Sequence, residues 1–420
     1  MRIAILFDNF GPYHLARLKA ASAVCELLAI EFGSSSMEYA WDASSDVELK
    51  REVLNKDGES ARLSRRDFKH RLERALNAFE PEAVFVPGWS CRGALLGLSW
   101  CLKQGVPAIV MSESTAWDDQ RHPVKEWIKS SIISLFSAAL VGGSPHRAYL
   151  EQLRMPPDRI FLGYDVVDNG FFSEEVRKIV EGRASRVESD AGKKKPYFLA
   201  SARFIKKKNL PMLLRAYALY RQEAITAVEV RGLLGNGHKQ HQSNNNDQPF
   251  PPWDFVLLGD GPMRPELCLL ISLLGLEGCV HMPGFKQYDA LPSYYAGASA
   301  FIHASKTEQW GLVVNEAMAS GLPVLVSNRC GCATDLVREG FNGWTFDPGD
   351  QKQLADLMCQ LSGDEMSGVK MGEGSREIIA EWGPDRFVSG FLSAIKSVNR
   401  FSKRRYGLFQ RLILWAMTCR

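Results

Sequence analysis

Short apolar runs of strand length alternate with longer segments of helical periodicity along the chain. In the first half, the apolar runs lie at 3–7, 83–87, 108–111 and 138–141. Runs of this kind are typical of parallel strands that are buried on both faces of a sheet. Between them, residues 15–26 and 66–79 have the spacing of amphipathic helices. The alternation predicts an open, doubly wound α/β sheet.

The same pattern starts again near residue 196, after a polar stretch from Glu174 to Lys195. Strand-like runs follow at 197–200, 255–258, 300–304 and 324–326. We therefore predict two Rossmann-like domains. The predicted organisation is a first domain over 1–172, an inter-domain segment over 173–195, a second domain over 196–383, a crossover helix over 384–400 and a basic amphipathic tail over 401–420.

Two segments depart from the strand–helix pattern. Residues 235–253 are polar and of low complexity, which predicts a loop insertion within the second domain. The tail carries basic residues and no acid, with apolar residues at helical spacing. It fits either a last helix packed on the protein body or a peripheral contact with an anionic membrane surface. Charge and spacing do not separate these two interpretations.

Composition narrows the class of protein. The chain has 420 residues, 45% hydrophobic and 24% charged, an ordinary globular balance for two domains. A net charge of +3 gives no reason to expect nucleic-acid binding. The nine cysteines lack zinc-site spacing, so we expect reduced thiols and no metal. The first apolar run is too short for a signal peptide, and no stretch reaches the ~20 apolar residues of a membrane span. The expected location is the cytoplasm, peripheral on the inner membrane face if the tail binds lipid.

The segment from Ala300 to Ser327 is the most informative about chemistry. It has the pattern strand, loop, helix, strand, and its helix begins at Gly311. The N–H groups at a helix start are unpaired and partly positive, so they form a seat for a diphosphate. Glu308 lies in the loop before the helix and Glu316 about a turn into it. At this edge of a sheet both carboxylates can accept hydrogen bonds from sugar hydroxyls.

This segment resembles a known family. The spacing Glu308-x7-Glu316, with Trp-Gly-Leu-Val between and Ala-Met-Ala-x-Gly-x-Pro-Val after, is similar to that of family-4 retaining glycosyltransferases, glycosyl transferases group 1. The resemblance implies the GT-B fold, in which two facing Rossmann-like domains enclose a cleft. It implies that Glu308 contacts the donor sugar and Glu316 the nucleotide ribose. The implied diphosphate ligands are the backbone amides around Gly311, Leu312 and Val313.

Further segments of the second domain resemble the same family. Arg203 and Lys208 lie five residues apart in a loop after a strand, and the resemblance implies that they stabilise the leaving diphosphate. Lys206 and Lys207 are interpreted as surface charge. The turn with Gly259 and Gly261, and the strand end at Gly284 and Phe285, are similar to donor-binding elements of the family. By this resemblance, the loop after Gly284 contacts the nucleobase.

The first domain resembles the family more loosely and is expected to face the acceptor. Gly11 and His14 follow the first strand, where the family has a glycine-rich loop; His14 is equally well explained as a capping or surface histidine. Glu113 stands where many relatives have an acceptor-side His-Asp, and a solvated loop acid explains it as well. Asp165 lies in an element similar to the family's domain crossover.

The predicted function is retaining transfer of a sugar from a nucleotide sugar, UDP- or GDP-linked, to an acceptor hydroxyl. The acceptor is expected to be a sugar or a lipid-linked sugar of cell-surface polysaccharide or glycolipid synthesis. No Asp-x-Asp motif occurs in the chain, which predicts a metal-independent reaction without a cofactor. The alternatives are another GT-B nucleotide-sugar enzyme, such as an epimerase, and a non-catalytic sugar-nucleotide-binding subunit.

Overall fold

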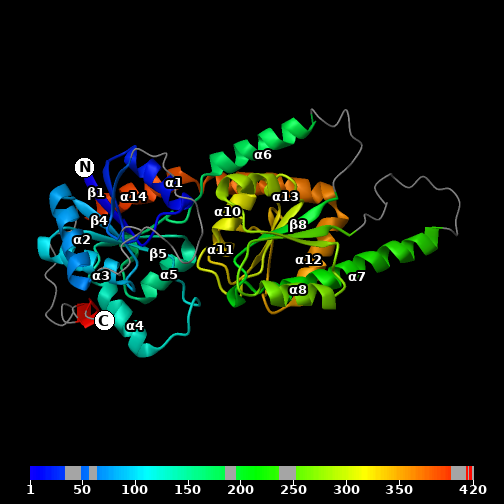
Figure 1. The fold of residues 1–420 in the computed structure, drawn as a ribbon, viewed down its shortest axis with the longest axis horizontal. Coiled ribbons are helices and arrows are strands. Elements are labelled where there is room, and N and C mark those ends of the chain that lie inside the picture. Colours follow the sequence, from blue (N-terminus) through cyan, green and yellow to red (C-terminus); the bar gives the residue numbers. More distant parts are fainter. Residues whose placement is uncertain are drawn as a thin grey trace. The chain divides into compact units, whose positions relative to one another are not determined.

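The computed structural model describes residues 1–33, 49–55, 64–184, 195–235, 252–398, 413–414 and 416–418. The chain forms two compact units (Figure 1). The first unit contains Met1–Asp168 together with Glu381–Arg420, and the second contains Asn169–Ala380. Both ends of the chain therefore belong to the first unit. Most of the predicted insertion at 235–253 lies outside the described residues.

The first unit is built on a parallel sheet of seven strands in the order β3-β2-β1-β4-β5-β6-β7. Its strands are β1 (Arg2–Phe7), β2 (Glu26–Glu31), β3 (Lys50–Val53), β4 (Ala83–Pro87), β5 (Ala108–Ser112), β6 (Ala138–Val141) and β7 (Ile160–Leu162). The strand order reverses between β1 and β4. The loops after these two strands therefore diverge at the edge where open α/β sheets bind ligands.

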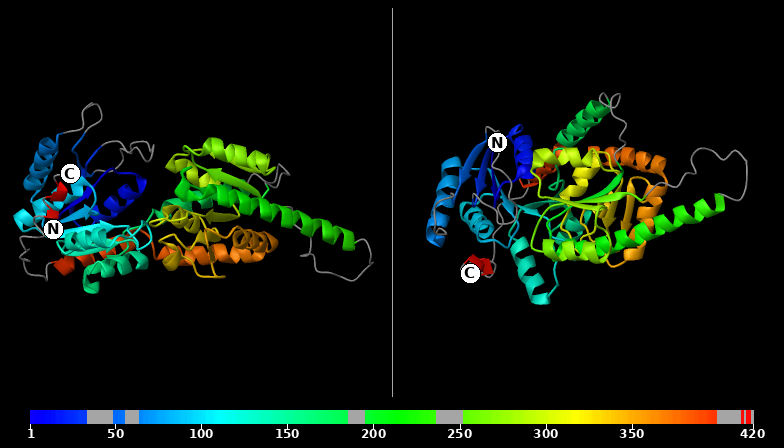
Figure 2. Two further views of the ribbon diagram at one scale, coloured as in Figure 1. Left: turned by 90° about the horizontal axis from the view of Figure 1, so that it is seen from below. Right: turned by 45° about the vertical axis from the view of Figure 1, so that its right-hand side comes forward.

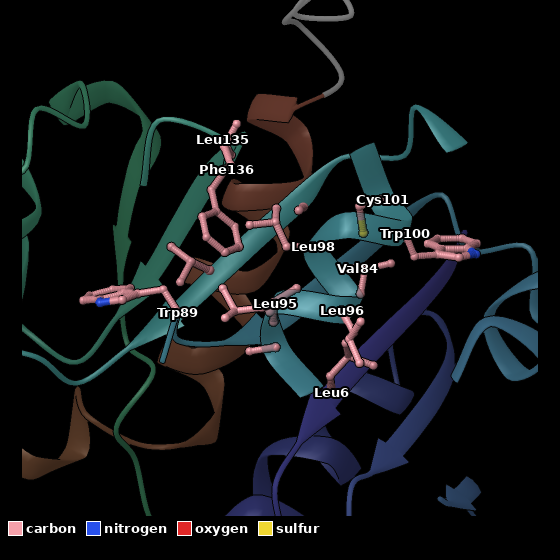
Figure 3. Packing of buried hydrophobic residues seen from close by; sticks show 14 of the residues in the cluster. Leu6, Val84, Trp89, Leu95, Leu96, Leu98, Trp100, Cys101, Leu135 and Phe136 are labelled. Atoms are coloured by element: carbon pink, nitrogen blue, oxygen red, sulfur yellow. The ribbon is translucent and has the colours of Figure 1, made fainter. Parts of the chain in front are cut away.

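Helices cover both faces of this sheet, which explains why its strands are apolar throughout. The helices of the first unit are α1 (Pro12–Ser22), α2 (Arg65–Phe79), α3 (Arg92–Gln104), α4 (Pro123–Ile133), α5 (Ser144–Gln152) and α14 (Pro384–Val398). Leu6 points to one face and lies beside Leu96 of α3 and Val84 of β4, as Figure 3 shows. Its neighbour Phe7 belongs to the opposite core layer, which α1 and α14 cover. This alternation is the signature of a two-sided parallel sheet.

The last part of the chain packs on the first unit. In α14, Phe391 stacks on Phe85 of β4 with 4.6 Å between ring centroids. Leu414 is buried in the core layer that contains α3, and Ile413 and Met417 pack beside it. The described part of the tail therefore fits the interpretation of packing on the protein body. The basic residues of 400–411 lie outside the described residues, and membrane contact stays a prediction.

The second unit has a parallel sheet of six strands in the order β10-β9-β8-β11-β12-β13. Its strands are β8 (Tyr197–Ser201), β9 (Asp254–Leu258), β10 (Val280–Gly284), β11 (Ala300–His303), β12 (Val324–Ser327) and β13 (Gly343–Phe346). The order reverses between β8 and β11. These are the strands after which the predicted diphosphate ligands and Glu308 follow in the sequence.

The helices of the second unit surround this sheet. They are α6 (Asn169–Ala184), α7 (Leu210–Gly235), α8 (Arg264–Leu273), α9 (Leu291–Tyr295), α10 (Leu312–Ala319), α11 (Ala333–Leu336), α12 (Gln351–Gly363) and α13 (Glu365–Ala380). Helix α7 is long and extends beyond the sheet in each view (Figure 2). In the described part of the chain, no helix is both long and apolar enough to cross a membrane.

The start of the second unit differs from the sequence-based prediction. The expected inter-domain segment at 173–195 begins inside helix α6, which belongs to the second unit. Its charged residues pair along the helix surface: Arg177 bonds to Glu174 at 2.9 Å and to Glu181 at 3.0 Å. Pairs at spacings of three and four residues support a helix. The charge run therefore marks a solvated helix face; residues 185–194 are not described.

Candidate donor site

The loops after β8 and β11 meet at the point where the second sheet reverses its strand order. The first loop carries the short helix Lys206–Lys208, and the second carries Glu308. Lys208 Nζ forms an ion pair with Glu308 Oε2. Lys207 Nζ lies 3.3 Å from the other carboxylate oxygen, Oε1. The structure thus brings two predicted site residues together, and it corrects the interpretation of Lys207 as surface charge.

Two buried residues also contact the Glu308 carboxylate. The Ser305 hydroxyl donates to Oε2 at 3.0 Å, and His303 Nε2 lies 3.5 Å from the same oxygen. The Glu308 side chain is 10% exposed. Burial by itself would raise the pKa of this carboxyl, but the Lys208 ammonium, with His303 and Lys207, holds the pKa well below its usual value. The carboxylate is therefore ionised across the neutral range.

The backbone of the Glu308 loop is fixed as firmly as its side chain. The Glu308 N–H donates to the Arg329 carbonyl at 3.0 Å, and its carbonyl accepts from the Gly331 N–H at 3.1 Å. Gly311 follows in a left-handed conformation, φ 102°, and no side chain caps helix α10. A Cβ on Gly311 would make only ordinary contact with Glu308, 3.6 Å from its Cγ, so the left-handed backbone rather than crowding favours glycine here. Glycine thus places the start of α10 directly beside Glu308.

The first turn of α10 contains the remaining predicted diphosphate ligands. Leu312 and Val313 are half-buried. Glu316, one turn on, is fully buried, and the Tyr295 hydroxyl donates to its Oε2 at 2.6 Å. Sequence analysis did not identify Tyr295 as a site residue. Its position at the end of the short helix before β11 is a weak signal, because many core tyrosines occupy such positions.

The two glycines after β9 pack against the loop that carries Arg203. A Cβ on Gly259 would lie 1.9 Å from the Ala202 carbonyl oxygen, and one on Gly261 would lie 2.8 Å from the Phe204 carbonyl oxygen. The Phe204 N–H also donates to the Asp260 carbonyl at 2.8 Å. The glycine turn therefore allows the backbone on both sides of Arg203 to pack closely. Through this contact it positions a predicted diphosphate ligand.

The end of β10 lies next to that turn. The Gly259 N–H donates to the Gly284 carbonyl at 3.1 Å. Gly284 is left-handed at φ 86°, and a Cβ there would meet no atom within 4 Å. Phe285 follows and is 39% exposed. An exposed aromatic ring at the carboxyl edge of the sheet is a surface on which a planar base can stack.

In the first unit, His14 caps the helix that follows β1. Gly11 is the N-cap of α1, and its N–H donates to His14 Nδ1 at 3.1 Å. Burial and the Arg17 charge lower the pKa of His14 to about 3. The imidazole is therefore neutral, with its proton on Nε2, because Nδ1 acts as an acceptor. The structure thus gives His14 a capping role at the start of α1.

This neutral histidine predicts a pH dependence of stability. In the folded protein the pKa of His14 is lowered from its ordinary 6.5 to about 3. At a pH between these two values, the unfolded chain therefore binds a proton at His14 that the folded chain does not bind. Stability is then lost as the pH falls from about 6.5 toward 3. His14→Gln keeps an acceptor for the Gly11 N–H but does not titrate. Between pH 6 and pH 4, the unfolding free energy of His14→Gln should fall less steeply than that of the unmodified protein. The two slopes should differ by up to ~1.4 kcal/mol per pH unit.

Urea unfolding at pH 7, 6, 5 and 4 measures this difference. The exposed His70, changed to glutamine in the same way, serves as the control. Identical slopes for His14→Gln and the unmodified protein would contradict the assignment of a neutral imidazole at position 14.

A buried ion pair lies beside His14. Arg17 and Asp165 are 1% and 0% exposed, with Nη2 of Arg17 3.9 Å from Oδ1 of Asp165. The Arg17 guanidinium also lies over the Tyr164 ring, 4.5 Å from its centroid. Burial and the charge of nearby Glu113 raise the pKa of Asp165 well above its usual value, against the opposite effect of Arg17. Residues from the elements after β1, β5 and β7 thus meet at Asp165; of these, Arg17 was not singled out by the sequence.

Comparisons with known proteins show which family and which fold the chain resembles. Residues 183–378 match the family model described as Glycosyl transferases group 1. Over 131 residues the chain is 35% identical to sulfoquinovosyl transferase SQD2 of Arabidopsis thaliana, covering 30% of this chain and 25% of that protein. Over 150 residues it is 31% identical to N-acetyl-alpha-D-glucosaminyl L-malate synthase of Bacillus anthracis, covering 36% of this chain and 39% of that protein. The chain thus spans well under half the length of these relatives.

The likeness to solved structures extends over nearly the whole chain. The Anabaena protein Alr3699/HepE, solved in complex with UDP-glucose, matches with a TM-score of 0.67 at 17% identity, covering 94% of this chain and 100% of that chain. This likeness confirms the predicted fold of two parallel-sheet, Rossmann-like domains. The stretch that carries Arg203, Lys208 and Glu308 therefore has the sequence of glycosyl transferases group 1, and the chain has the GT-B fold.

Proposed function

We propose that this protein transfers a glycosyl group from a nucleotide-sugar donor to an acceptor hydroxyl. The observation that carries the proposal is the contact of Lys208 with Glu308 beside the start of α10, at the switch point of a sheet within the matched segment. The ammonium group and the helix start suit a diphosphate, and an ionised carboxylate suits sugar hydroxyls. An epimerase or a binding subunit has no specific observation in its favour.

The chemistry that we propose is retention of the anomeric configuration without a metal. Arg203, Lys208 and the amides of Gly311, Leu312 and Val313 stabilise the negative charge on the leaving diphosphate. The acceptor hydroxyl attacks the face from which the diphosphate departs, and the departing phosphate oxygen takes the hydroxyl proton. Glu308 orients the donor sugar, since positioning accounts for much of such a rate enhancement.

The rest of the donor is assigned to neighbouring groups. We place the ribose at Glu316 and the base near Gly284 and Phe285. A UDP-sugar is the first donor to test, because the Anabaena neighbour was solved with UDP-glucose. The acceptor side is assigned to the first unit, around Gly11, His14 and Glu113, and a sugar or lipid-linked sugar of polysaccharide or glycolipid synthesis is the acceptor class. Membrane contact through 401–420 would bring the protein to such a lipid.

A thermal-shift screen tests the proposal before any acceptor is known. The purified protein is heated in EDTA with UDP-, GDP- and ADP-glucose, each at several concentrations. One nucleotide class should raise the unfolding midpoint with a dependence on ligand concentration, because binding to the folded state stabilises it. Lys208→Met should abolish that shift. No shift with any donor, or an equal shift in Lys208→Met, would contradict the proposed donor site.

A further inference from the structure

Lys207 occupies a distinct position in the donor site. Its Nζ lies 3.3 Å from Glu308 Oε1, whereas Lys208 pairs with Oε2. Each carboxylate oxygen thus has its own lysine. The Lys207 side chain is 38% exposed and that of Lys208 is 12% exposed. Lys208 is therefore the inner cation of the site, and Lys207 is the outer cation, nearer to solvent.

The charges of this cluster do not balance. Two ammonium groups face one carboxylate, and the nearby His303 adds no charge near neutral pH, because burial lowers its pKa. The cluster therefore carries one surplus positive charge. It lies beside the uncapped start of α10, whose N–H groups add further positive potential. This arrangement suits an added anion.

Glu308 does not depend on the lysines alone for its position. Ser305 donates to Oε2 at 3.0 Å, and His303 lies 3.5 Å from the same oxygen. Both side chains are buried, at 0% and 3% exposure, so their geometry is fixed by the core around them. The carboxylate can therefore stay in place while the flexible lysine side chains move.

We propose that Lys207 is a second lysine ligand of the donor diphosphate. In the absence of a donor, the Glu308 carboxylate pairs with Lys207 and Lys208, and the phosphate oxygens replace it when a donor binds. The inference rests on the proposed function. On binding, the two ammonium groups transfer from the carboxylate to phosphate oxygens, which are acceptors of higher charge. The carboxylate, still held at Oε2 by Ser305 and His303, then accepts hydrogen bonds from the donor sugar.

Binding of nucleoside diphosphates tests this exchange without involving the sugar. Affinities for UDP, GDP and ADP are measured by calorimetry in EDTA for the unmodified protein, Lys207→Met and Lys206→Met. Lys206 is the matched control, since it is exposed and lies on the same helical turn. For the nucleotide that binds, Lys207→Met should weaken affinity about 10-fold, the effect of one charged hydrogen bond. Lys206→Met should change it less than about 2-fold.

Two further variants separate charge from structure. Lys207→Arg keeps a cation and should retain affinity within about 3-fold. Glu308→Gln removes the carboxylate that competes with phosphate and repels it, so the nucleoside diphosphate should bind at least about 3-fold tighter. A lysine without a role in diphosphate binding would instead leave the affinity unchanged in both Lys207→Met and Lys207→Arg. Equal affinities of Lys207→Met and Lys206→Met, or weaker binding by Glu308→Gln, would overturn the inference.

The outcome also distinguishes this inference from the proposed function. If the unmodified protein binds UDP, GDP or ADP and Lys208→Met loses that binding, the donor site stands. If Lys207→Met then binds as tightly as Lys206→Met, the exchange of carboxylate for phosphate at Lys207 is refuted, but the donor site is not. If the unmodified protein binds none of the three nucleotides, the donor site fails and the exchange fails with it. An unfolding midpoint of Lys207→Met within a few degrees of that of Lys206→Met shows that both variants are folded.

Discussion

Replacing Glu308 by glutamine is expected to lower the rate of sugar transfer by about 100-fold or more, the effect of removing one preorganised charged group from an active site. Glutamine keeps the size of the side chain and one acceptor oxygen for Ser305. It removes the charge that the surrounding lysines and His303 keep ionised. The rate of nucleoside diphosphate release with saturating donor measures the effect.

Stability provides the control for this variant. The lysines released by Glu308→Gln are partly exposed and can reach water, so the unfolding midpoint should fall by only a few degrees. The exposed Glu277, changed to glutamine, should leave both rate and midpoint unchanged. A rate within about 3-fold of that of Glu277→Gln would remove Glu308 from the catalytic machinery.

Replacing Gly259 by alanine is expected to be the most destabilising single change in the donor site. The new Cβ would lie 1.9 Å from the Ala202 carbonyl oxygen, at a backbone φ of +121°. Backbone strain and overpacking together should cost about 3 kcal/mol or more. For a unit of this size, the cost corresponds to an unfolding midpoint lower by roughly 6–12 °C.

A second glycine separates strain from collision. Gly275 is also left-handed, at φ +65°, but a Cβ there would meet no atom within 4 Å. Gly275→Ala should therefore cost only about 1 kcal/mol. Calorimetric melting of the two variants gives the comparison. Equal midpoints would show that the turn does not pack against the Arg203 loop. Because the turn positions the Arg203 loop, the Gly259→Ala protein that remains folded should also bind nucleoside diphosphate more weakly.

Much of the fold follows from local patterns in the sequence. The apolar runs predict the strands because both faces of each sheet are buried, and β4 and β6 have the predicted bounds. Errors occur where a local pattern has two meanings. The helix predicted to reach Glu26 ends at Ser22, and Glu26 begins β2 by pairing with Arg2. The charge run after Glu174 is typical of an inter-domain segment and equally of a solvated helix face, and its ion pairs form only once the residues are helical.

The candidate site was predictable where it depends on a continuous motif. Glu308, Glu316 and Gly311 belong to one strand–loop–helix segment, so their positions relative to one another follow from the sequence. Lys207 was not identified, because its contact with Glu308 joins loops about a hundred residues apart. His303 stands within the motif, but only the folded structure shows its ring nitrogen beside the Glu308 carboxylate. Such contacts depend on the strand order of the sheet, which no single segment encodes.

The most direct test of this account is release of nucleoside diphosphate from a nucleotide sugar by the purified protein in EDTA. UDP-, GDP- and ADP-sugars are supplied with lipid-linked and soluble sugar acceptors, and Glu308→Gln and Lys208→Met are assayed in parallel. The account predicts that one donor is consumed by the unmodified protein, that EDTA has no effect, and that both variants are strongly impaired. Equal release by all three proteins, or no release from any donor with any acceptor, would contradict it.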